Sequence, residues 1–149
     1  AKGSTIASTM YASGADVIYQ AAGGTGTGVF TAAKEVNEKL SADSNKKVWV
    51  IGVDRDQSAE GNYTSSDKKK SNFVLTSTIK QVGTVVKDIA NDQVKGKEFE
   101  GGKTKTYGIK DGGVDIVTSS LPSDIKDAVV KAKDQIKNGE LKPTDGLSK

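Results

Sequence analysis

Two short runs of consecutive apolar residues constrain the fold of this chain more than any other feature. They are ADVIYQ at residues 15–20 and KVWVIGVD at residues 47–54. Strands with one solvated face alternate apolar and polar side chains, whereas consecutive apolar residues indicate a strand that is covered on both faces. Apolar residues recur at helical spacing between the two runs, in residues 29–40. The sequence therefore predicts an α/β fold with a mainly parallel sheet and helices on both faces.

Further elements are predicted on both sides of these runs. Ile6, Ala7, Met10 and Tyr11 share one face of an opening helix that ends near Gly14. The later predicted elements are a polar loop at 55–72, a short strand at 73–77 that runs into a helix over about 75–94, strands at 106–109 and 114–117 around a turn at 110–113, and a last helix with Ser123 as N-cap that ends at Gly139. The apolar face expected for the helix over about 75–94 consists of Ile79, Val82, Val86 and Ile89.

Composition excludes several classes of function. The chain has 149 residues, enough for one ordinary domain, and it contains neither cysteine nor histidine. Thiolate nucleophiles, imidazole bases and the usual zinc ligands are therefore absent. The net charge of +3 is spread along the chain, and no basic stripe with interleaved aromatic residues indicates nucleic-acid binding. The apolar runs are far shorter than a membrane span, so the chain as given is expected to be soluble.

A glycine-rich segment, GGTGTG at residues 23–28, joins the first predicted strand to the helix after it. It lacks the Gly-Lys-Ser/Thr of a phosphate-binding P-loop. A dinucleotide fingerprint fits poorly, because Val29 or Phe30 stands where a third glycine is needed and Asp54 comes later than expected. Two interpretations remain: a tight turn without a ligand, and a helix N-terminus whose amides bind a polar or anionic group.

Asp54 and Asp56 follow the second predicted strand, and ligands of parallel sheets bind beyond the carboxyl ends of strands. With Thr76 and Lys110 the two acids resemble a magnesium or phosphoacceptor site, although the earlier strand supplies no further acid. Alternatively, Asp54 accepts hydrogen bonds from a vicinal diol such as ribose, Lys110 donates another, and Tyr19 stacks on a flat ring. The competing structural roles are a core position for Tyr19, a loop cap for Asp56 and an exposed turn lysine for Lys110.

Four segments in this order together resemble the basic-membrane-protein family. They are GADVIYQAAGGTGTGVFTAAKE, VWVIGVDRDQ, VLTSTIKQVGTVVKDI and YGIKDGGV, and the similarity runs from about Gly14 to Val117. Members of this family are nucleoside-binding lipoproteins that serve ABC transporters, and their fold is similar to that of periplasmic sugar-binding proteins of type I, with two α/β lobes. The resemblance implies that this chain is one flavodoxin-like lobe.

The resemblance also assigns residues to the ligand. Those it implies are Tyr19, Gly23, Gly24, Thr25, Asp54, Asp56 and Lys110. It places Tyr19 against the base, at a position where the family tends to have phenylalanine. The additional hydroxyl of Tyr19 therefore affects which base is preferred. Asp54 accepts hydrogen bonds from the sugar hydroxyls, Lys110 reaches the same sugar, and the two glycines and Thr25 line the cleft by their backbone. Asp56 and Gln57 match the motif.

The function that the resemblance implies is that of a solute-binding component of an ABC importer, which binds nucleosides, purines favoured, between two lobes. Such a protein is not an enzyme, uses no metal or cofactor, meets a transporter permease, and is lipid-anchored at the extracellular face of the membrane. Family members are about twice this length, so residues 1–149 are expected to be a C-terminal part without the N-terminal lobe. The helix over about 75–94 would then pack on that lobe or on a partner chain. Without it, the helix is expected to repack on its own sheet or to form a homodimer.

Two alternatives to this function remain open from the sequence. The first is a stand-alone flavodoxin-like domain that binds a nucleotide or a phosphoryl group. The second is a chain that binds nothing alone, because half a cleft provides only half of the contacts.

Overall fold

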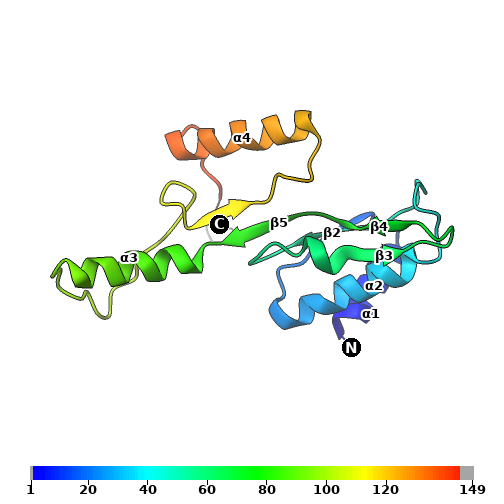
Figure 1. The fold of residues 1–149 in the computed structure, drawn as a ribbon, viewed down its shortest axis with the longest axis horizontal. Helices are drawn as coiled ribbons and strands as arrows, with labels where there is room; N and C mark the ends of the chain where they lie inside the picture. The colour runs from blue at the N-terminus through cyan, green and yellow to red at the C-terminus, as the bar shows by residue number, and fades with distance from the viewer. Residues whose placement is uncertain (1, 145–149) are drawn as a thin grey trace. The chain divides into compact units, whose positions relative to one another are not determined.

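The computed structural model describes residues 2–144, which form two compact units, one up to Ile79 and the other from Lys80 onward. Figure 1 shows the ribbon of both units, which are described separately below. The fold is mixed α/β with a mainly parallel sheet, as predicted. Within residues 2–144, no helix has both the length and the apolar character needed to cross a bilayer.

The sheet of the first unit is parallel. Its strands are β1 (Val17–Tyr19), β2 (Trp49–Gly52) and β5 (Val74–Lys80), in the order β1-β2-β5. Ile18 is in register with Val50, and Val50 is in register with Val74. All three of these side chains are buried, so they form a row across the sheet that faces the core. The two strands that the apolar runs predicted are thereby confirmed.

Two helices of the first unit, α1 (Lys2–Ala12) and α2 (Thr27–Asn37), lie on the same side of the sheet (Figure 1). The buried residues of these helices include Ala7, Tyr11, Val29, Phe30, Ala32 and Ala33. Of the face predicted for the opening helix, only Ala7 and Tyr11 are buried, whereas Ile6 and Met10 are exposed. The helix ends where predicted, since Gly14 has a φ of +97°. Val17 and Tyr19, whose side chains alternate with that of Ile18, are exposed.

The predicted loop at 55–72 contains regular structure, so that prediction was wrong. A 3₁₀ turn, η2 (Ser58–Gly61), leads into an antiparallel hairpin of β3 (Asn62–Thr64) and β4 (Lys70–Asn72). These strands have three residues each, too few for an alternation to stand out in the sequence. The hairpin nevertheless supplies the core with Tyr63, whose ring lies 5.9 Å from that of Phe73.

Two buried tyrosines of the first unit provide a matched test of hydroxyl burial. The Tyr63 hydroxyl is buried with no hydrogen-bond partner among the described residues, whereas the Tyr11 hydroxyl donates to the Trp49 carbonyl at 3.0 Å. Burial raises the pKa of Tyr11 to about 12, so this donor keeps its proton at neutral pH. Tyr63→Phe is expected to raise the free energy of unfolding by about 1 kcal/mol, and Tyr11→Phe to lower it by about 1 kcal/mol.

Urea unfolding followed by tryptophan fluorescence measures both effects. Trp49 is the single tryptophan of the chain and lies in the first unit, so its signal reports the unfolding of that unit. A Tyr63→Phe variant that is less stable than the parent would show that the hydroxyl has a partner.

The second unit begins at Lys80, the last residue of β5. β5 continues to Lys80 and α3 (Val82–Val94) starts after it, so the prediction of a helix from about residue 75 was wrong. Residues 74–80 include four β-branched side chains, which favour the strand. Ile79 therefore belongs to the strand and not to the apolar face of the helix.

α3 carries its apolar residues on its surface. Val82, Val86 and Ile89 recur at helical spacing and are 63%, 60% and 43% exposed, and no residue of the helix is buried. The expected repacking of this helix onto the chain's own sheet and the expected homodimer both remain predictions.

The rest of the second unit consists of a turn, a strand and a helix. The predicted strand at 106–109 is absent from the described structure, because residues 108–113 close a turn in which the Gly113 N–H donates to the Gly108 carbonyl at 2.9 Å. β6 (Val114–Ile116) confirms the predicted strand after it. α4 (Ser123–Asn138) ends at Gly139 as predicted, with a φ of +78°, but its N-cap is Pro122 and Ser123 is already helical.

Candidate functional site

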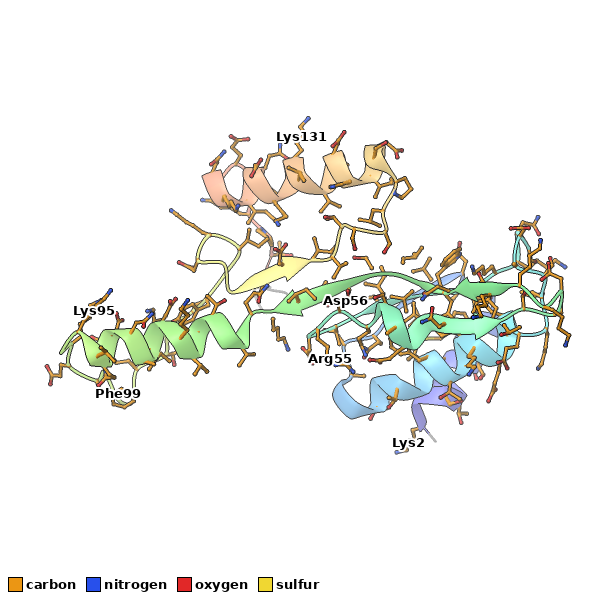
Figure 2. The ribbon with its side chains drawn as sticks, in the orientation of Figure 1. Lys2, Arg55, Asp56, Lys95, Phe99 and Lys131 are labelled. Atoms are coloured by element: carbon orange, nitrogen blue, oxygen red, sulfur yellow. The ribbon has the colours of Figure 1, made fainter. Side chains whose placement is uncertain are left out.

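The carboxyl ends of β1 and β2 lie at the same edge of the sheet, because the two strands are parallel and in register from Val17 to Tyr19. The Gln20 N–H still donates to the Ile51 carbonyl, at 3.3 Å, directly beyond the strand. The glycine turn follows β1 and Asp54 follows β2, so both predicted loops start from this edge. Figure 2 shows Arg55 and Asp56 on the loop that follows β2. Parallel sheets bind their ligands at this edge.

The glycines of residues 23–28 have two different roles. Gly23–Gly26 form a 3₁₀ turn, η1, which leads directly into α2. A Cβ on Gly26 would collide with the side-chain amide of Gln20, and a Cβ on Gly28 would lie 2.7 Å from the backbone carbon of Gly3. Internal packing thus requires glycine at these two positions. This agrees with the interpretation of the segment as a tight turn without a ligand.

Gly23, Gly24 and Thr25 are exposed, and the space around a Cβ on either glycine is open. Gly23 has a φ of +52°, a backbone conformation that favours glycine. Gly24 has neither a positive φ nor a close neighbour, so nothing in the internal packing accounts for a glycine there. The backbone of this turn faces solvent, which is what the predicted contact with a ligand requires.

Asp54 is exposed and has a φ of +72°, one of two non-glycine residues in the described structure with a positive φ. Left-handed backbone at a residue with a side chain is strained and collects at functional sites. The residue before it is fixed, because the Val53 N–H donates to the Gln57 Oε1 at 2.9 Å. A rigid connection therefore carries the strained aspartate at the end of β2.

Asp56 has a structural task. Its carboxylate accepts a hydrogen bond from the Ser58 N–H at 2.9 Å, at the start of η2. The backbone and side-chain hydrogen bonds from Ser58 hold the pKa of Asp56 below its usual value. This geometry favours the structural role of Asp56 as a loop cap. A contact between Asp56 and a ligand remains a prediction.

Tyr19 is 52% exposed and therefore does not belong to the core. Its hydroxyl lies 3.3 Å from the Thr78 Oγ1, and β2 stands between the strands that carry these two residues. The Thr78 hydroxyl also reaches the Gly52 carbonyl, at 3.4 Å. The tyrosine ring thus extends across the end of β2, near the start of the Asp54 loop, with half of its surface in contact with solvent.

Lys110 belongs to the second unit, where it is exposed in the turn 108–113. The Asp111 carboxylate accepts a hydrogen bond from the Gly108 N–H at 3.1 Å and so stabilises this turn. Within its own unit, Lys110 is an exposed lysine of a turn, as the structural alternative predicted. The first unit brings together the other predicted residues, and the role of Lys110 stays a prediction.

The sequence analysis missed one residue at this edge, Gln20, and gave Gln57 no role of its own. Both side chains are buried and hydrogen-bonded to each other at 2.9 Å. The only signal in the sequence was a polar residue at the end of an apolar run.

In the described part of the chain, no group of three or more acidic, histidine or cysteine side chains is placed to hold a metal ion.

Solved structures identify the class of fold. A solute-binding protein of an ABC transporter system from Aeropyrum pernix K1 superposes with a TM-score of 0.65 and 24% identity, over 98% of this chain and 45% of that one. A transcriptional activator of the comK gene from Bacillus halodurans superposes with a TM-score of 0.69 and 22% identity, over 94% of this chain and 43% of that one. The chain thus has the fold of part of such solute-binding proteins.

Sequence comparison gives the family. The profile described as ABC transporter substrate-binding protein PnrA-like, or Bmp, matches residues 1–144, and the chain belongs to this family. The ABC transporter nucleoside-binding protein BmpA of Lactococcus lactis subsp. cremoris is 58% identical over 141 residues. The match covers 95% of this chain and 39% of that relative, so the chain spans well under half of the relative's length. The resemblance seen in the sequence is confirmed.

Proposed function

We propose that this chain is part of the solute-binding component of an ABC importer and contributes one wall of a nucleoside site, with purine nucleosides preferred. Membership of the family supports the proposal, as does the name of the Lactococcus lactis relative, a nucleoside-binding protein of an ABC transporter. The observation that carries it is Asp54, an exposed and strained aspartate at the carboxyl end of β2, beside the exposed backbone of the glycine turn.

Each exposed group at the edge has a chemical task in this proposal. The Asp54 carboxylate accepts hydrogen bonds from the two sugar hydroxyls, the half-exposed ring of Tyr19 stacks on the base, and the backbone of Gly23–Thr25 lines the space between them. Lys110 donates to the same sugar. The task is binding without catalysis, and it needs no metal or cofactor.

The second wall of the site, in this proposal, comes from the part of the relatives that this chain does not match. That part would also cover the apolar residues of α3, which are exposed here. Removal of this apolar surface from water contributes roughly 25 cal/mol per Å². The complete protein would deliver its ligand to an ABC permease, held at the extracellular face of the membrane by a lipid anchor.

A phosphate site is the second candidate, and one observation favours it. Gly23, Gly24 and Thr25 are exposed and lie directly before α2, so part of the backbone near a helix N-terminus is open to solvent. Guanosine and GMP separate the two candidates. A nucleoside site binds guanosine, which has no phosphate. A phosphate site binds GMP but not guanosine.

Replacement of Asp54 by asparagine tests the proposal by isothermal titration with guanosine, adenosine and GMP. Asparagine tolerates a positive φ, so Asp54→Asn removes the charge without adding backbone strain, which Asp54→Ala would add. We expect guanosine to bind the parent protein and the affinity to fall about a hundredfold in Asp54→Asn, since two hydrogen bonds to a charged acceptor are weakened.

Asp43→Asn is the matched control, because Asp43 is an exposed-loop acid that pairs with Lys69 and lies before β2 in the chain. It is expected to bind guanosine as the parent protein does. Equal guanosine affinity of Asp54→Asn and the parent would contradict the role of Asp54. Binding of GMP but not of guanosine would favour the phosphate site instead.

A further inference from the structure

The side chain of Gln57 is buried directly behind the exposed edge of the sheet. Only 9% of the residue is exposed. Its Oε1 accepts a hydrogen bond from the Val53 N–H, which can only donate, so the orientation of the amide is fixed by the backbone. Its Nε2 then donates to the Glu60 Oε2 at 2.8 Å, and its own backbone N–H donates to the Ser77 Oγ at 3.1 Å. Gln57 therefore fixes the loop that carries Asp54 from inside.

The same oxygen of Gln57 accepts a second hydrogen bond, from the Gln20 Nε2 at 2.9 Å. Gln20 follows β1 and is 4% exposed. Because its Nε2 must face Gln57, its Oε1 faces the other way, toward Gly26, and has no hydrogen-bond partner among the described residues. A Cβ on Gly26 would collide with this oxygen. The amide of Gln20 is thus held between the Asp54 loop and the glycine turn.

We propose that Gln20 and Gln57 form a positioning link, which fixes the glycine turn and the Asp54 loop in one relative geometry. The proposal rests on the proposed function, since it assumes that these two loops contact the same ligand. Neither glutamine contacts the ligand, because both are buried. The link instead makes the two groups of contacts available together, so that little ordering is left for the moment of binding.

A set of variants tests the link with two measurements, the guanosine affinity and the backbone amide resonances of Gly24 and Asp54. Gln20→Leu and Gln57→Leu each interrupt the link, so each is expected to weaken binding about tenfold, and the double variant is expected to weaken it no more than one of them does. Gln57→Leu is also expected to move the Gly24 resonance, although the hydrogen bonds of Gln57 are to other residues.

One rescue variant and one control separate a link from general loosening. In the rescue, Gln57→Glu with Glu60→Gln, position 57 still accepts from Val53 and Gln20 while position 60 becomes the donor, so affinity and resonances are expected to return toward the parent values. The control, Asn72→Ala, loses the hydrogen bond from the Asn72 Nδ2 to the Ser58 carbonyl. It loosens the same loop without interrupting the link, so the Gly24 resonance is expected to stay in place.

The outcomes also separate this proposal from the proposed function. Additive effects of the two leucine variants on affinity, or an equal movement of the Gly24 resonance in Asn72→Ala, would overturn the link while the nucleoside site stands. If the parent protein fails to bind guanosine but Gln57→Leu still moves the Gly24 resonance, the link between the loops is supported and the nucleoside function is not.

Discussion

Replacement of Gly28 by alanine is expected to lower the free energy of unfolding of the first unit by about 3 kcal/mol. The new methyl group would lie 2.7 Å from the backbone carbon of Gly3 and closer still to the backbone nitrogen of Ser4. Backbone atoms cannot move aside as the end of a flexible side chain can, so α1 must shift away from α2. Overpacking of a well-packed interior costs about 1–3 kcal/mol, and this site lies at the upper end because only backbone is in contact.

Gly24→Ala is the matched control for this prediction. Gly24 lies four residues earlier in the same glycine-rich segment, in η1, but a Cβ there meets nothing within 4 Å. Its effect on stability in the absence of ligand is expected to remain within about 0.5 kcal/mol. Urea unfolding followed by Trp49 fluorescence compares the two variants. Equal stability of the two would mean that α1 does not pack against α2 as described.

The second large effect is expected for Asn37→Leu, also about 3 kcal/mol. Asn37 ends α2 and is completely buried. Its Nδ2 donates to the Val48 carbonyl at 2.8 Å, and its Oδ1 accepts from the Val48 N–H at 3.0 Å. Leucine has a similar size but no polar group, so both backbone groups of Val48 lose their partners in the interior. Each such loss costs about 1–3 kcal/mol.

Asn91→Leu provides the control, since Asn91 is an exposed residue of a helix in the second unit. We expect the Trp49 unfolding transition to be the same in this variant as in the parent protein. If the Asn37→Leu variant were as stable as the parent protein, the N–H and the carbonyl of Val48 would have found other partners, such as water.

The helix that carries Asn37 illustrates what the sequence could and could not predict. Helical spacing of Phe30, Ala33, Val36 and Leu40 predicted α2, and Phe30 and Ala33 are buried, although the helix ends at Asn37 and does not reach Leu40. The buried position of the last turn is nevertheless Asn37, while Val36 is only half-buried. Apolar spacing cannot identify a polar residue whose partner, the backbone of Val48, is made available only by the fold.

The failures elsewhere in the fold have related causes. β3 and β4 are too short to show a period, and their one core residue, Tyr63, packs against the ring of Phe73, a contact that forms only when the hairpin has folded. The extension of β5 to Lys80 was missed because its apolar residues run on at a spacing that a helix also allows. Both errors concern short segments whose structure is decided by tertiary contacts.

For the candidate site, the sequence predicted which of the named residues share one edge of the sheet. The rule for parallel sheets was enough to bring Tyr19, the glycine turn and Asp54 to one edge. It could not divide the glycines into those required by packing and those open to solvent, because that division depends on Gly3 and Gln20, which lie outside the motif. The positive φ of Asp54 likewise has no signature in the sequence.

The hairpin of β3 and β4 has a practical consequence for handling this protein. Its tip is anchored by a hydrogen bond from the Ser66 N–H to the Leu40 carbonyl, and the Lys47 ammonium reaches the Ser71 hydroxyl at 2.8 Å just before β2 begins. The tip therefore lies toward the amino end of β2, opposite the edge that carries Asp54. Since the chain contains no cysteine, a single thiol introduced at the exposed Ser66 would be unique. A dye or a solid support attached there would leave the opposite edge of the sheet accessible to dissolved molecules.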